Sequence, residues 1–211
     1  MNTSTVCIFD GPSNFNGERV IVLITGYSRP SANTKTGNML QSFIIPVSHE
    51  SIRLAVLAGA DQAVCGDCKL RPANNGNIPC YVDVVRGPGG AYRSWKSGNV
   101  WTVTPENAGA MATAPLRIGS WGDPACVDSE IWRRFEAHSS HKSGTGYTHD
   151  WVNNPGLSDI TMASIDPDNH PDTDGALARA HALGFRTYRV LKPGDKPRPD
   201  EFLCPEVTHG V

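Results

Sequence analysis

The sequence predicts a single α/β domain with a mainly parallel sheet, built from short βα units as an open sheet or a partial barrel. Two observations lead to this prediction. Short apolar runs alternate with segments of helical spacing, and such alternation is typical of parallel strands joined by helices. The length of 211 residues, of which 39% are hydrophobic, suits one domain of the larger sort.

The chain is expected to begin with a flexible lead-in over residues 1–18, which are rich in Asn, Ser and Gly. The domain itself is expected to span residues 19–192. Its first strand is RVIVLIT (19–25), a continuous β-branched run of the kind found in buried strands. The other elements of the first half are predicted from their spacing and their end residues: a strand at 39–47, a helix at 51–58 and a short helix around Tyr92 and Trp95.

The second half alternates strands and helices more regularly. Its helices are amphipathic or capped, with Asp128 and Asp174 as expected N-terminal residues. The Pro-rich residues 193–211 are expected to form a tail on the surface. The predicted elements are strands at 116–121, 146–149, 160–165 and 185–191, and helices at 129–138 and 176–183.

Composition and charge narrow the functional classes. The net charge of −2 gives no general attraction to nucleic acid or to an anionic membrane, although it leaves room for a local basic patch. An apolar run of 18 residues is missing from the sequence, so we expect no membrane span. The N-terminus lacks the basic and apolar regions of a secretory leader, so the six cysteines favour a reducing compartment, the cytoplasm.

Three cysteines, Cys65, Cys68 and Cys80, lie in one short stretch, VCGDCKLRPANNGNIPCYVD. The residues between them favour turns, so this loop (65–80) is expected to fold around a bound metal ion or cluster. The CxxC supplies two ligands and Cys80 a third, and we expect Cys204 to be the fourth. Zinc is the expected metal, with a [4Fe–4S] cluster as the alternative. Buried structural thiols and a redox-active CxxC are two further interpretations.

Chemistry in parallel α/β sheets is concentrated at the carboxyl ends of the strands. Asp123, His149 and Asp166 lie at the ends of predicted strands, so we expect them to face one cleft as acid–base residues. Alternatively, the two aspartates only form turns that end their strands. The loop SRPSANTKTGN follows another strand and contains Arg29, Lys35 and no acidic residue. It is expected to bind phosphate, unless it is only a solvated loop.

Several longer strings resemble a family of uncharacterised proteins encoded by bacteriophages and prophages, among them GYSRPSANTKTGNMLQ, LRIGSWGDPACV, GYTHDW and GFRTYRV. No activity is established for that family, so the resemblance implies a phage origin rather than a mechanism. Its members end in a cysteine-rich tail after Cys-Pro, and the matching Cys204-Pro205 is present here. A fainter resemblance is to the partial barrels of radical S-adenosylmethionine enzymes. It depends on Cys80-Tyr81, whereas the cysteine spacing differs from the CxxxCxxC of those enzymes.

Three functions follow as hypotheses. The first is a phage-encoded metalloprotein that acts on nucleic acid or a nucleotide, in the host cytoplasm, through the cleft at the strand ends. The second is a non-catalytic protein that binds and inhibits a host protein, such as a defence factor. The third is a radical or redox enzyme with an iron–sulfur cluster.

Overall fold

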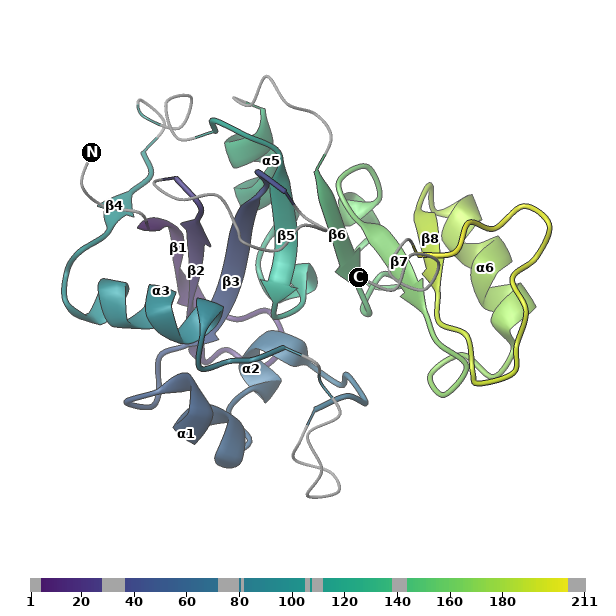
Figure 1. Cartoon of the computed structure of the whole chain (residues 1–211), viewed down its shortest axis with the longest axis horizontal. Helices are drawn as coiled ribbons and strands as arrows, with labels where there is room; N and C mark the ends of the chain where they lie inside the picture. Colours follow the sequence, from purple (N-terminus) through teal and green to yellow (C-terminus); the bar gives the residue numbers. More distant parts are fainter. Residues whose placement is uncertain are drawn as a thin grey trace.

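The computed structural model describes residues 5–27, 37–71, 80, 82–104, 107, 112–137 and 144–204. Within these residues the chain forms one eight-stranded sheet, in the order β4-β1-β2-β3-β5-β6-β7-β8. The sheet is open, and α6 packs beside its last strands at the far end of the molecule (Figure 1). The α/β fold with an open sheet, predicted from the sequence, is therefore confirmed.

Most neighbouring strands of the described sheet run parallel. Five pairs are parallel, and β1–β2 and β2–β3 are antiparallel. The strands are β1 (Thr5–Pro12), β2 (Arg19–Thr25), β3 (Leu40–Pro46), β4 (Trp101–Thr102), β5 (Leu116–Trp121), β6 (Thr145–Thr148), β7 (Met162–Ile165) and β8 (Arg186–Arg189).

The described helices are short, and several have the expected caps. Asp128 accepts a hydrogen bond from the Glu130 N–H, which confirms it as the cap of α5. Helix α6 starts earlier than predicted because Asp172, rather than Asp174, caps it. Among the described residues no helix has the length and apolar character needed to cross a membrane. The helices are α1 (Ile52–Leu57), α2 (Gln62–Cys65), α3 (Gly87–Lys96), α5 (Ser129–Glu136) and α6 (Thr173–Ala182), with 3-10 turns η2 (Pro124–Cys126) and η3 (Pro155–Leu157).

The core is centred on β2 and β3. Every residue from Val20 to Ile24 is fully buried, as are Ile44 and Ile45. Fully burying an aliphatic side chain of this size contributes about 1.5–3 kcal/mol. The two central strands therefore form a rigid base, and the helices α1 and α2 lie near the end of β3 (Figure 1).

The sequence predicts a flexible lead-in over residues 1–18, but Thr5–Pro12 form strand β1, so the prediction is wrong for these residues. Val6 and Cys7 are buried, and the antiparallel pairing with β2 satisfies the backbone of the strand. The apolar part of this strand is only VCIF, set between polar residues and Asp-Gly-Pro. So short a run in a polar context does not predict a strand.

The direction of β2 determines where the predicted phosphate loop starts. Thr25 lies opposite Gln41, near the beginning of β3, and β5 begins beside the same residue. The carboxyl end of β2 is therefore at the edge of the sheet where β3 and β5 begin. Tyr27, just after β2, is therefore on the opposite side of the sheet from the ends of β3 and β5, and Arg29 and Lys35 lie outside the described residues.

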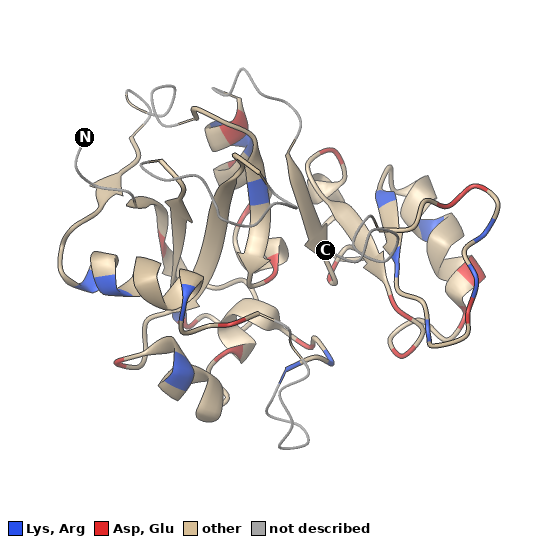
Figure 2. Ribbon diagram, in the orientation of Figure 1, with Lys and Arg blue, Asp and Glu red and all other residues tan. Residues whose placement is uncertain are grey.

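The described part of the Pro-rich tail is attached to the domain by ion pairs. Arg189 at the end of β8 pairs with Glu201 at 2.5 Å. Arg198 also pairs with Asp174 in the first turn of α6. Figure 2 shows that positive and negative residues are interspersed in this region around α6. The tail is thus fixed by local charge pairs rather than by burial in the core.

We expect the Arg189–Glu201 pair to make the protein sensitive to acid. The hydrogen bonds from Arg189 lower the pKa of Glu201 from 4.5 to about 2. The pair therefore stabilises the fold fully above pH 4.5 and loses this contribution as the pH falls towards 2. Between pH 4.5 and 2, the free energy of unfolding of the wild-type protein should fall by up to about 1 kcal/mol more than that of the Glu201→Gln variant. Urea unfolding at several pH values measures the difference, and identical pH slopes would contradict it.

Candidate active site

Asp123 is a buried carboxylate at the carboxyl edge of the sheet, only 5% exposed. Its Oδ1 accepts hydrogen bonds from the Ala125 N–H (2.9 Å) and the Thr148 hydroxyl (2.7 Å). Its Oδ2 accepts the His149 N–H at 2.7 Å, and the Asp123 N–H donates to the Val64 carbonyl at 2.6 Å. These bonds join the ends of β5, β6 and α2, so the position of the carboxylate is fixed from three sides.

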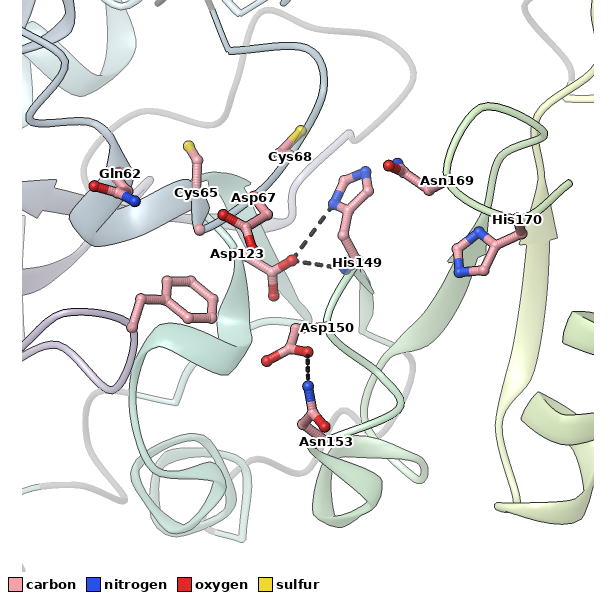
Figure 3. Close-up of a pocket in the computed structure, with 12 residues that line it drawn as sticks. Gln62, Cys65, Asp67, Cys68, Asp123, His149, Asp150, Asn153, Asn169 and His170 are labelled. Carbon is pink, nitrogen blue, oxygen red and sulfur yellow. Dashed lines mark hydrogen bonds and ion pairs between the residues drawn. The ribbon is translucent and has the colours of Figure 1, made fainter.

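His149 directs its ring at this carboxylate, with Nδ1 at 3.4 Å from Asp123 Oδ2 (Figure 3). Burial lowers the pKa of His149, but the hydrogen bond and charge of Asp123, together with the charge of Asp166, outweigh it and raise the pKa above 6.5. Because Nδ1 lies toward Asp123, Nε2 is the atom that can exchange a proton with a ligand. The pair has the geometry of an oriented general acid–base.

Two cavities meet at this pair, and Cys65, Cys68, Asp123 and His149 line both of them. The first, called the polar cavity, has a volume of about 300 Å³ and is also lined by Gln62, Asp67, Asp150, Asn153, Asn169 and His170. The second, called the apolar cavity, has a volume of about 220 Å³ and is also lined by Val56, Leu57, Leu70, Cys80, Val82, Val84, Trp121 and Tyr147. A ligand that occupies either cavity therefore meets the Asp123–His149 pair.

The described lining of the polar cavity is acidic. It contains the carboxylates of Asp67, Asp123 and Asp150, and no Lys or Arg is among its described residues. Asn153 donates to Asp150 at 2.6 Å, as Figure 3 shows, while burial raises the pKa of Asp150. The charge of this cavity favours ligands that carry hydrogen-bond donors or a positive charge.

Arg71 holds the loop that carries the cysteines. Its guanidinium forms a bidentate pair with Asp61, at 2.9 and 3.2 Å, and also donates to the carbonyls of Gly66 and Gly59. Both charged side chains are buried, with 10% of Arg71 and 2% of Asp61 exposed. Because Gly59 and Gly66 flank α2 and precede Cys68, this one side chain fixes the path of the chain around the first two cysteines.

The three predicted ligands of the cysteine loop line one cavity. Cys65, Cys68 and Cys80 are all partly buried and all face the apolar cavity. Burial raises the pKa of Cys65 and Cys68, and the neighbouring thiols and Asp123 raise it further. Without a cation the thiols of Cys65 and Cys68 are therefore protonated at neutral pH, whereas a bound cation would deprotonate them.

The fourth predicted ligand is not placed with the other three. Cys204 is exposed and lines neither cavity. In the part of the chain that the structure describes, no group of three or more His, Cys, Asp or Glu side chains is arranged to hold a metal ion. The loop thus brings thiols to a common cavity without an assembled ligand sphere.

Asp166 supports the site rather than lining it. Its carboxylate accepts hydrogen bonds from the N–H groups of Asp168 and Asn169 at 3.0 Å, and from the Asn169 side chain. This turn carries Asn169 and His170 to the polar cavity, where the His170 ring also packs at a tilt of 30° against the buried Trp151, with ring centroids 5.5 Å apart. Of the three predicted acid–base residues, Asp123 and His149 meet directly, and Asp166 acts on His149 through its charge.

Several residues of the site were not predicted from the sequence. Thr148 could have been found, because it directly precedes His149 at a strand end. Asp61 and Arg71 carry no local pattern that indicates their pairing, since a buried ion pair depends on how the loop folds. His170 lies in an acidic stretch, and its place at the cavity depends on the Asp166 turn and on its contact with Trp151, which no local pattern indicates.

Comparison with known proteins adds no relative: the chain matches no protein-family model, and no curated protein and no solved structure is significantly similar to it. The function must therefore be inferred from the site itself.

We expect Arg71→Ala to destabilise the fold strongly. The change leaves the Asp61 carboxylate buried without its partner, which typically costs about 3–5 kcal/mol. The matched control is Arg86→Ala, because Arg86 and Asp83 pair at the surface with side chains 88% and 53% exposed. That change should cost less than about 1 kcal/mol. Urea unfolding compares the two variants, and equal losses would show that Arg71 does not hold the loop.

Proposed function

We propose that this protein is an enzyme that performs general acid–base chemistry on a small molecule at the Asp123–His149 pair, beside a metal site formed by Cys65, Cys68 and Cys80. The observation that carries the proposal is the buried Asp123 carboxylate, which orients His149 where the polar and apolar cavities meet. A perturbed imidazole in a cleft is a common property of catalytic sites. The proposal thus retains the strand-end cleft that the sequence predicts.

The charge of the cleft supports a small substrate rather than a nucleic-acid backbone. Phosphate contacts need cations, and the described lining of the polar cavity supplies three carboxylates instead. Of the two arginines that line the apolar cavity, Arg71 is paired with Asp61 and Arg53 is exposed on α1. Binding of a nucleotide phosphate would therefore depend on Arg29 and Lys35.

The metal part of the proposal depends on three thiols that line one cavity, and binding would have to draw them into a ligand sphere that the described residues do not form without a metal. Three cysteines at one cavity can supply three of the four ligands that zinc or a [4Fe–4S] cluster requires. A bound zinc ion or cluster would hold the three sulfurs as thiolates, because a coordinating thiol is deprotonated. The residues of the chain would then hold the substrate, exclude water from the apolar side and move the proton at Nε2.

Metal analysis of anaerobically purified protein tests this part. We expect about one zinc, or about four irons with absorbance near 400 nm, per chain. The Cys65→Ser/Cys68→Ser double variant should lose the metal, whereas Cys7→Ser, a buried thiol of β1 far from the loop in sequence, should keep it. Less than about half a metal ion per wild-type chain would contradict the metal site.

Hydrolysis of p-nitrophenyl acetate tests the acid–base part. Water adds to the ester carbonyl and gives its proton to His149 Nε2, and p-nitrophenolate leaves. The wild-type rate should exceed that of His149→Gln by about 100-fold, because positioned general bases contribute about 10²–10⁴. The rate should rise with pH through the raised pKa of His149, and Asp123→Asn should move this rise to lower pH.

The control for this measurement is His181→Gln, which changes a histidine on α6 that contacts Thr187 instead of the cavities. This variant should hydrolyse the ester at the wild-type rate. If His149→Gln and His181→Gln behave alike, ester hydrolysis does not depend on the proposed pair.

A further inference from the structure

The wall shared by the two cavities separates surfaces of opposite chemistry. On one side lie carboxylates and amides, such as Asp67, Asp150 and Asn153. On the other side lie aliphatic and aromatic side chains, such as Val84, Trp121 and Tyr147. A substrate that reaches His149 from both sides must have an apolar end and a polar end.

The apolar cavity has the dimensions and walls of a site for one flat ring. Its volume is about 220 Å³, below the roughly 300–1,000 Å³ of sites for drug-sized ligands, so only a small group fits. Trp121 and Tyr147 are its two aromatic walls, and aromatic rings prefer to pack on other rings at offset or edge-to-face angles. Gly119 and Gly122 also line it, but a Cβ at either position would meet protein atoms at 2.8 Å, so the space for a ring comes from the side chains around the cavity.

The lining of the polar cavity determines which chemical group the polar end of the substrate can carry. Its carboxylates and side-chain amides accept hydrogen bonds, and its described lining has no Lys or Arg to neutralise them. An amine or a hydroxyl group fits this lining, whereas a carboxylate or phosphate is repelled by it. Asp67 is exposed at the rim of the cavity, where it can meet an entering cation.

We propose that the substrate is a small molecule in which one aromatic ring is joined to an amine or hydroxyl group, with the ring in the apolar cavity and the donor in the polar cavity. The reacting atom then lies between the two groups, next to His149 Nε2. This inference depends on the proposed function for the position of the reacting atom, but the binding that it predicts can be measured without any reaction.

The test compares two probes with the same ring and opposite charge, 2-phenylethylamine and 3-phenylpropanoate, by calorimetry. The amine should bind at least about tenfold more tightly than the carboxylate. Val84→Trp fills the apolar cavity and should weaken amine binding at least about tenfold, whereas the neighbouring Val85→Trp should not, because Val85 is 51% exposed and outside the cavity. Leu57→Trp narrows the same cavity from an exposed position and replaces Val84→Trp if that variant does not fold.

Charge is tested separately with Asp67→Asn, which should reduce the preference for the amine, and with Asp200→Asn, an exposed aspartate of the tail, which should not. Equal binding of the two probes, no binding of the amine, or full binding by the filled variants would overturn the inference. His149→Gln should still bind the amine. If the protein shows no preference for the amine but still hydrolyses the ester in a way that depends on His149, only the further inference is refuted. If the amine binds as expected but ester hydrolysis does not depend on His149, only the proposed function is refuted.

Discussion

The arrangement of the site depends on one buried negative charge. Removing a carboxylate from water costs several kcal/mol unless hydrogen bonds and positive charge compensate for it. Asp123 obtains this compensation from the Ala125 and His149 N–H groups, the Thr148 hydroxyl and the His149 ring. The end of β6 must therefore lie beside the end of β5, and His149 must direct its ring inward. The catalytic geometry is in this sense a consequence of stabilising Asp123.

The chain can place Asp123 there only because of the glycine before it. Gly122 has φ +86°, and a Cβ at this position would lie 2.8 Å from the Cβ of Ile44. A side chain would thus meet both backbone strain and a fully buried neighbour in β3. Gly122 therefore lets the backbone turn sharply at the end of β5, which brings the carboxylate under β6 instead of into solvent.

The sequence predicts those parts of the fold and site that depend on local patterns. Continuous β-branched runs such as residues 19–25 indicate strands, and polar residues directly after such runs, such as Asp123, indicate the strand-end site. Features that depend on distant partners were not predicted. The direction of β2 follows from its pairing with β1 and β3, and this pairing puts the carboxyl end of β2, at Thr25, on the opposite edge from Asp123. The pairing of Asp61 with Arg71 likewise arises only when the loop folds.

Charge balance connects the thiols, the acid–base pair and the polar cavity. Cys65 and Cys68 lie close to Asp123, and the pKa of each thiol rises mainly because the thiol is buried, with a further rise from neighbouring thiols and carboxylates. Arg71 is the nearest buried cation of the loop, and Asp61 neutralises it. The described site therefore combines carboxylates that have few cationic neighbours with thiols that stay protonated. A positively charged substrate group in the polar cavity would offset its carboxylates, whereas a metal ion would offset the thiolates that its own binding creates. The two proposals therefore place compensating charge on opposite sides of the Asp123–His149 pair.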